Sequence, residues 1–98
     1  MTSIGDTTVF AAISEHLTAE LEGEAVLLHV KRGTYYGLNQ VGATVWKLLR
    51  QPQSFRGICN AIEQQYDVLP DTAERDLRDL LDKMLAAGLV EIVSGAGS

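Results

Sequence analysis

The stretch "TYYGLNQVGATVW", residues 34–46, joins a run typical of a β-strand directly to the start of a helix. Thr34–Leu38 is rich in aromatic and β-branched side chains, which favour strands. Asn39 stands at a helix N-cap position, where its side-chain oxygen can accept from a free backbone N–H of the first turn. The sequence therefore predicts a strand that ends directly at a helix, which raises the question of what the exposed edge of that strand binds.

A β-hairpin is predicted to include this strand. Residues 25–30 are β-prone, "KRGT" with Gly33 supplies a turn, and Thr34–Leu38 resumes the strand. Before the hairpin, His16–Leu21 alternates loosely between apolar and polar residues, which is typical of a further strand. A small antiparallel sheet of three strands is the expected result.

Three helices are predicted after the strands, each with an apolar stripe at helical spacing. Pro52 ends the first because it removes a donor and disfavours helical geometry in the preceding residue. Ser54 can cap the second. In the third, Pro70 suits the first turn, and Asp71 with Glu74 has capping-box spacing. The stripes are Val41, Val45, Leu48 and Leu49; Phe55, Ile58, Cys59, Ile62 and Tyr66; and Ala73, Leu77, Leu80, Leu81, Met84 and Leu85.

Strands followed by helices in fewer than 100 residues indicate an α+β domain, with an antiparallel sheet lying against the helices. We expect this domain to span residues 16–93. Residues 1–15 are expected to be flexible or weakly ordered. Within them "TVFAAI" could begin a strand, but it is not counted among the predicted strands. "LVEIV" could add a short closing strand, and residues 94–98 are expected to form a flexible tail.

The composition fits one folded domain, because 98 residues with 46% hydrophobic content can bury a single core. No apolar run approaches the ~20 residues that a membrane-spanning helix needs. The first ten residues contain no Lys or Arg, so the positive start of a secretory signal is missing. We therefore expect a cytoplasmic protein that does not associate with membranes.

The net charge of −5 is concentrated in residues 1–24, which contain five acidic and no basic residues. In residues 71–88, five acidic residues stand against three basic ones. Because a phosphate-binding surface needs clustered positive charge, nucleic acid is disfavoured as a partner. A basic peptide is easier to accommodate.

Few residues are suited to catalysis or metal binding. A zinc site needs about four thiol or imidazole ligands, and the chain offers only Cys59, His16 and His29. Cys59 lies on an apolar stripe, where a free cysteine usually behaves as a buried hydrophobe. His29 alternates out of phase with the apolar residues around it, so we expect it at the surface or lining a groove. The sequence predicts neither an enzyme nor a cofactor.

Three stretches carry a family likeness: "GEAVLLHVKRGTYYGLNQVGATVWKLL", "FRGICNAIEQQYDV" and "ERDLRDLLDKMLAAGLVEI". They resemble the PqqD-like family, recognition elements that bind leader peptides in pathways for ribosomally made, modified peptides. Within it the chain looks most like the stand-alone leader-binding proteins of lasso-peptide pathways. The resemblance implies a winged helix-turn-helix-like fold in which three strands precede three helices. It also implies a binding protein without catalytic activity.

In that family the leader peptide adds as a further strand beside the third strand, and its side chains enter a groove against the third helix. The bound leader is presented to a cysteine-protease-like leader peptidase and to an asparagine-synthetase-like cyclase. Carried over to this chain, the strand is Thr34–Leu38 and the helix is residues 71–88. The peptide-binding residues implied are Thr34, Tyr35, Tyr36, Gly37 and Leu38 on the strand and Ala73, Asp76, Leu77, Asp79, Leu80, Lys83 and Met84 on the helix.

Tyr35 and Tyr36 must point to opposite faces of the sheet, so one can close the core while the other lines the groove. The sequence does not decide which. The predicted apolar anchors are Leu80, Met84 and one tyrosine, with Asp76 or Asp79 as the partner of a Lys or Arg of the leader.

Two other functions remain open at this point. One is the peptide chaperone of pyrroloquinoline quinone biosynthesis, which shares the fold but serves a radical enzyme. The other is a winged-helix DNA-binding regulator, whose recognition helix would here be acidic, a poor match to phosphate.

Overall fold

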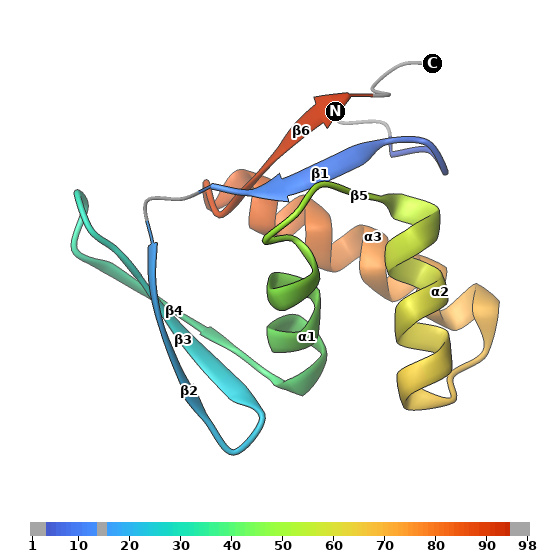
Figure 1. The fold of residues 1–98 in the computed structure, drawn as a ribbon, viewed down its shortest axis with the longest axis horizontal. Coiled ribbons are helices and arrows are strands. Elements are labelled where there is room, and N and C mark those ends of the chain that lie inside the picture. The colour runs from blue at the N-terminus through green and yellow to red at the C-terminus, as the bar shows by residue number, and fades with distance from the viewer. Residues whose placement is uncertain (1–3, 14–15, 95–98) are drawn as a thin grey trace.

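The computed structural model describes residues 4–13 and 16–94 of the chain. Figure 1 shows the arrangement of the helices and strands found over these residues. In chain order they are β1 Val9–Ala12, β2 His16–Leu21, β3 Glu24–His29, β4 Thr34–Leu38, α1 Gln40–Leu48, β5 Gln53–Ser54, α2 Phe55–Tyr66, α3 Pro70–Ala86 and β6 Val90–Ser94. The α+β class is confirmed, as is the run of three antiparallel strands followed by three helices.

The three predicted strands form an antiparallel sheet in the order β2-β3-β4. At the turn between β2 and β3, Glu22 and Gly23 have φ values of 51° and 85°. Positive φ at both central residues matches the right-handed twist of a two-residue hairpin. Leu27 on β3 pairs with Thr18 on β2 and with Tyr36 on β4, so these three residues share one face of the sheet.

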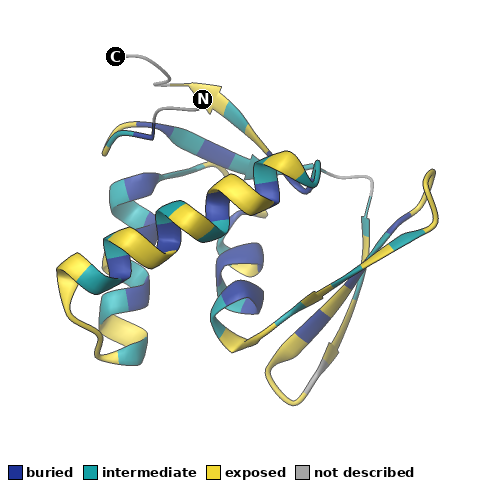
Figure 2. Cartoon of the chain, turned by 180° about the vertical axis from the view of Figure 1, so that it is seen from behind, coloured by how far each residue is buried: buried dark blue, intermediate teal, exposed yellow. Residues whose placement is uncertain are grey.

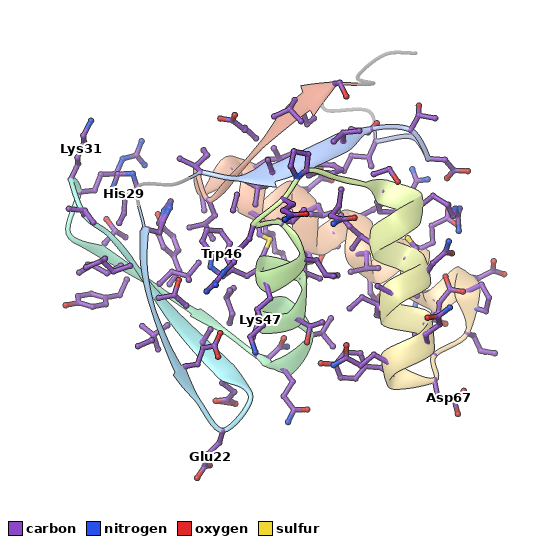
Figure 3. All side chains as sticks on the ribbon, in the orientation of Figure 1. Glu22, His29, Lys31, Trp46, Lys47 and Asp67 are labelled. Atoms are coloured by element: carbon purple, nitrogen blue, oxygen red, sulfur yellow. The ribbon has the colours of Figure 1, made fainter. Side chains whose placement is uncertain are left out.

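That inner face contacts α1. Trp46 extends from α1 toward the sheet (Figure 3), and its Nε1–H donates to Thr18 Oγ1 over 3.1 Å. Lys47 Nζ lies 3.3 Å from Glu20 Oε2. The inner face consists of His16, Thr18, Glu20, Ala25, Leu27, His29, Thr34, Tyr36 and Leu38; the outer face consists of Leu17, Ala19, Glu24, Val26, Leu28, Tyr35 and Gly37.

His29 is expected at the surface or lining a groove; the surface position is wrong, because His29 is only 7% exposed and lies on the inner face. Its Nδ1 accepts from the Arg32 N–H over 3.2 Å, and its ring lies edge-on to the ring of His16, with 4.8 Å between centroids. The error has a simple cause. The run "AVLLHV" is apolar in both phases, so alternation alone cannot assign either set to the core; the structure leaves Val26 and Val30 exposed instead.

A second antiparallel sheet, in the order β5-β1-β6, covers the other end of the helices (Figure 1). Its central strand is β1, in which Phe10 pairs with Gln53 on β5 and with Ile92 on β6. Phe10 is fully buried. The closing strand expected in "LVEIV" is present as β6.

Of the N-terminal segment 1–15 that is expected to be flexible or weakly ordered, residues 4–13 are described and include β1, whereas residues 1–3 and 14–15 lie outside the described part of the chain. Of the predicted tail at 94–98, Ser94 ends β6 and residues 95–98 lie outside the described part. Arg78 Nη1 donates to the Ile4 carbonyl over 2.8 Å, and Arg56 Nη2 lies 2.9 Å from Asp6 Oδ1. A four-residue strand has little local propensity signal, and its partner β6 lies about eighty residues away. Long-range pairing with β5 and β6 and the burial of Phe10 stabilise it.

The helix caps are confirmed for two of the three helices. Asn39 Oδ1 accepts from the Gly42 N–H over 2.9 Å, and Ser54 Oγ accepts from the Gly57 N–H over 3.0 Å. The predicted capping box of α3 does not form, since its N-cap is Leu69 and no side chain bonds there. Glu74 instead pairs with Arg78, 2.9 Å away. Pro70 at the first turn takes over the role of initiating the helix, because its fixed φ suits that position.

The core lies between the three helices and the inner faces of the two sheets. In Figure 2 the buried residues of α3 form a stripe along one side of the helix, which includes Ala73, Leu77, Leu81 and Met84. The mostly polar opposite side of α3 is exposed. Over the part of the chain that the structure describes, no helix is both long and apolar enough to cross a membrane.

Candidate functional site

β4 lies at the edge of its sheet, with β3 on one side and no strand on the other among the described residues. An edge strand presents backbone N–H and C=O groups that can pair with another chain. β4 ends at Leu38 and is followed directly by Asn39, the N-cap residue of α1. Residues 34–46, which form β4 and the start of α1, therefore place an open sheet edge next to the helices.

The two tyrosines of β4 point in opposite directions, and the structure decides which one faces α3. Tyr36 is half-buried on the inner face, and its hydroxyl donates to the Ala87 carbonyl over 3.2 Å. Tyr35 lies on the outer face and is 69% exposed. Tyr36 thus links β4 to the C-terminal end of α3. This contact closes one end of the space between β4 and α3.

Replacing Tyr36 by Phe is expected to lower the free energy of unfolding by about 0.5–1.5 kcal/mol, the net value of a typical intramolecular hydrogen bond. Urea denaturation measures this difference. Tyr35→Phe is the matched control, since Tyr35 projects into solvent, and it should change stability by less than ~0.5 kcal/mol. Equal effects of the two substitutions would contradict the role assigned to Tyr36.

Partly buried apolar side chains of β4, α1 and the C-terminal half of α3 with its cap adjoin one another, since Tyr36 bonds to Ala87 and since Val41 and Leu80 line one pocket. These side chains pack against the core yet keep part of their surface accessible. We call this set the seam; it consists of Tyr36, Leu38, Val41, Leu80 and Ala87. Side chains of a segment paired with β4 would reach the seam on alternate residues.

An apolar pocket of about 90 Å³ lies among α1, α2 and α3. Its apolar lining consists of Val41, Ile62, Tyr66, Ala73, Leu77 and Leu80, with Val68 from the α2–α3 connection. Thr72 and Asp76 are its polar members. Since Val41 and Leu80 also belong to the seam, the pocket is continuous with it. We call it the three-helix pocket.

The predicted residues of α3 differ in accessibility. Ala73, Leu77 and Met84 are buried in the core, with Met84 only 2% exposed; Ala73 and Leu77 also line the three-helix pocket. Leu80 is half-buried in the seam. Asp79 Oδ2 lies 3.0 Å from Lys83 Nζ, an exposed i,i+4 ion pair. Of the two candidate carboxylates, only that of Asp76 lines the three-helix pocket.

Five lining residues of the pocket are absent from the sequence prediction of the site: Val41, Ile62, Tyr66, Val68 and Thr72. Val41, Ile62 and Tyr66 belong to the predicted apolar stripes of their helices, but spacing shows only that a residue faces inward. Which helices meet around one cavity depends on how they pack.

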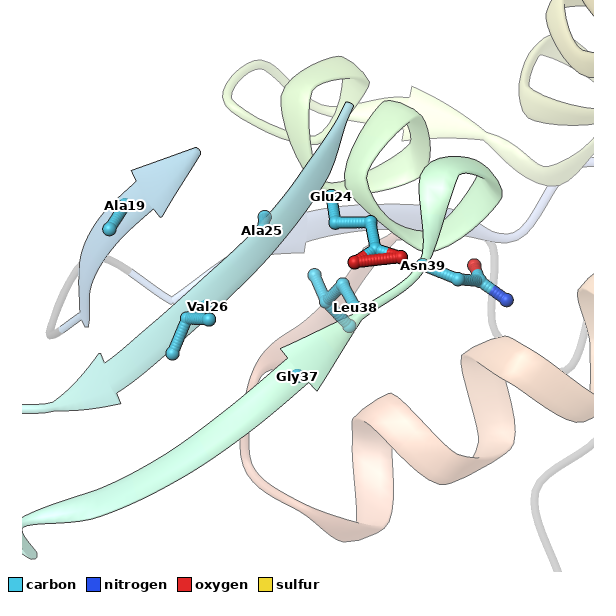
Figure 4. A pocket seen from close by; sticks show the side chains of 7 residues that line it. All are labelled: Ala19, Glu24, Ala25, Val26, Gly37, Leu38 and Asn39. Carbon is cyan, nitrogen blue, oxygen red and sulfur yellow. The ribbon is translucent and has the colours of Figure 1, made fainter. Parts of the chain in front are cut away.

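A hollow of about 270 Å³, shown in Figure 4, lies at the β2-β3-β4 sheet, and its lining includes the outer-face residues Ala19, Glu24, Val26 and Gly37. Val26 stands between Ala19 on β2 and Gly37 on β4 in the register, so small side chains flank it. A Cβ added at Gly37 would meet nothing within 4 Å. The predicted site residues Tyr35 and Gly37 therefore lie on this side of the sheet, away from the seam.

Cys59 is fully buried in α2, and burial raises the pKa of its thiol from the ordinary 9.0 to about 11, against a smaller lowering by Arg56. A nucleophile needs the thiolate. The raised pKa disfavours it at neutral pH, and the site described above contains no cysteine. Cys59 is a core residue.

At pH 8 we expect the Cys59 thiol of the native protein to react with a disulfide reagent at least about 100-fold more slowly than that of the urea-unfolded protein, because two pKa units remove about 100-fold of the thiolate. Since the thiol form is favoured in the fold, its contribution to stability is constant below pH 9 and is lost as pH rises toward 11. Equal rates in the native and unfolded proteins would contradict this burial.

These features define a small α+β domain in which an open-edged antiparallel sheet precedes three helices. The family model described as coenzyme PQQ synthesis protein D (PqqD) matches residues 24–90, and the chain belongs to this family. None of the proteins with curated functions matches it.

Three solved structures are similar to this chain. TbiB1 in complex with the TbiA(beta) leader peptide is 36% identical, with a TM-score of 0.76 over 87% of this chain and 99% of that chain. Lasso peptide synthetase B1 complexed with the leader peptide is 26% identical, with a TM-score of 0.72 over 84% and 96%. The PqqD truncation of Methylobacterium extorquens PqqCD, a RiPP recognition element, shares the fold at 21% identity, with a TM-score of 0.74 over 92% and 96%.

Proposed function

We propose that this protein captures the leader peptide of a ribosomally synthesised precursor by adding it as a strand to the edge of β4. The observation that carries the proposal is the open β4 edge beside the seam, in a chain 36% identical to a protein solved with a leader peptide. Backbone bonds to β4 supply affinity, and side chains that reach the seam supply selectivity. The protein itself is not a catalyst.

The energetics of such binding favour a few strong contacts. A short segment buries an interface at the small end of the usual range and must be ordered when it binds, which costs several kcal/mol. Leu80 is therefore expected to be a dominant contact, because it belongs to both the seam and the three-helix pocket. Thr34 and Leu38 lie at the two ends of β4, with their side chains on the inner face, so both would neighbour the added strand.

We place the protein in a lasso-peptide pathway, where it presents the leader in the cytoplasm to a cysteine-protease-like peptidase and to an asparagine-synthetase-like cyclase. The support is the order of identities, since the two lasso-pathway structures are 36% and 26% identical and the PqqD truncation 21%. The name of the matching family favours a second candidate, the peptide chaperone of pyrroloquinoline quinone biosynthesis. Neighbouring genes for a peptidase and cyclase, or for a radical enzyme, separate the two.

A fluorescently labelled leader peptide from the adjacent open reading frame tests the proposal by anisotropy. Strand addition requires backbone N–H groups of the peptide, so N-methylation at alternate residues should abolish binding at one phase and spare it at the other. The protein is unchanged in this comparison, so misfolding cannot explain a loss. Binding that is insensitive to N-methylation throughout the peptide would exclude strand addition. A gel shift with DNA at low salt, expected to be absent, tests the regulator alternative.

A further inference from the structure

The three-helix pocket is too small for a whole ligand and is suited to one side chain. Its volume of about 90 Å³ is well below the ~300–1,000 Å³ of sites that enclose a small molecule. Apolar cavities of about 150 Å³ hold one benzene ring. A smaller volume favours a branched aliphatic side chain over an aromatic ring.

The lining of the pocket is fixed before anything binds. Tyr66 is held against α1 by two contacts of its hydroxyl, 2.7 Å from Thr44 Oγ1 and 3.2 Å from the Gln40 carbonyl, to which it donates. Ile62 and Leu77 are buried at 3% and 1% exposure. A preformed apolar lining costs little conformational entropy when it is filled, which favours its use in binding.

The pocket lies where a peptide paired with β4 would continue. Only Asn39 separates β4 from α1, and Val41 in the first turn of α1 lines the pocket. Leu80 connects the pocket to the seam. A segment that pairs along Thr34–Leu38 and extends past Leu38 therefore meets the pocket next.

Asp76 is the acidic residue in the lining of the pocket. The Asp76 side chain is 68% exposed, and its nearest ionic contact is Arg75 Nε at 3.5 Å, on the adjacent residue of the helix. Such an exposed pair is weak, so the Asp76 carboxylate can exchange it for a ligand cation. Asp79 is instead engaged by Lys83 one turn further along α3.

We propose that the three-helix pocket holds one aliphatic side chain of the peptide while Asp76 pairs with a Lys or Arg close to it in the peptide sequence. This specificity rests on the proposed function, to which it adds a contact beyond the β4 edge. It gives binding roles to Val41 on α1 and to Tyr66 on α2, in addition to the residues of β4 and α3.

The test measures anisotropy of the labelled leader peptide with wild-type protein, Asp76→Lys and the matched control Asp82→Lys. Asp82 is exposed on α3 outside the pocket, and both substitutions change the net charge equally. We expect Asp76→Lys to weaken binding at least about fivefold and Asp82→Lys less than about twofold. A peptide in which the pairing Lys or Arg is replaced by Glu should bind the Asp76→Lys protein more tightly than it binds the wild-type protein.

The aliphatic preference is tested on the peptide alone. An alanine scan should find one Leu, Ile or Val near that cation whose loss weakens binding at least about tenfold, and Phe at that position should fail to restore it. If wild type binds but the two lysine variants behave alike, or Phe binds as well as the natural residue, the pocket assignment is overturned and capture at β4 stands. If wild type does not bind the leader, the proposed function itself fails.

Discussion

Replacement of Leu80 by Asp is expected to weaken leader binding by ~2 kcal/mol or more, about a thirtyfold rise in Kd. Leu80 is half-buried, lies in the seam and lines the three-helix pocket. A carboxylate there would be desolvated by the bound peptide and would replace apolar contact on both sides. Isothermal titration with the leader peptide measures the change.

Leu85→Asp is the matched control, because it makes the same chemical change at another half-buried position of α3. At ~100° per residue, Leu85 is about 140° around the helix axis from Leu80. Both variants lose some stability, so binding is compared at a temperature where circular dichroism shows both folded. Unchanged affinity in Leu80→Asp, or an equal loss in Leu85→Asp, would remove Leu80 from the site.

Replacement of Phe10 by Ala is expected to lower the free energy of unfolding by about 3–5 kcal/mol. Phe10 is fully buried on the central strand of the β5-β1-β6 sheet, so truncation leaves a cavity under both neighbouring strands. A domain of this size is stabilised by about 5–15 kcal/mol in total. The variant should therefore unfold at a much lower urea concentration, with the midpoint followed by circular dichroism.

The control for Phe10 is Val93→Ala, on β6 of the same sheet. Val93 is 44% exposed and its truncation removes little buried surface, so the change should stay within ~0.5 kcal/mol. A loss below ~1 kcal/mol in Phe10→Ala would show that the N-terminal strand contributes little to the core. That result would restore the sequence-based expectation that residues 1–15 lie outside the domain.

Much of the fold follows from short-range signals. Asn39 and Ser54 cap the helices that their side chains predict, and Pro70 stands in the first turn of α3. The β2-β3-β4 meander follows from β-prone runs separated by turn residues. These signals succeed because each acts over three or four residues, within reach of the sequence pattern alone.

The sequence predicts which strand and helix form the candidate site, but not which of their side chains are accessible in it. The sequence and its family likeness point to Thr34–Leu38 and to α3, and both elements contribute residues to the seam. The structure leaves Tyr35 outside, buries Met84 and brings Val41 and Tyr66 to the pocket. Periodicity assigns residues to faces, but the partner of each face is set by packing.

The sequence by itself determined the number of helices, the caps of two of them, the strand that ends at Leu38 and membership of the PqqD family. Only the tertiary structure decided that Tyr36 faces the helices, that His29 is buried and that β1 completes the fold. The physical reason is the range of the interactions. Tyr36 and Ala87 are 51 residues apart, and Phe10 pairs with Ile92, so neither contact leaves a trace in local composition.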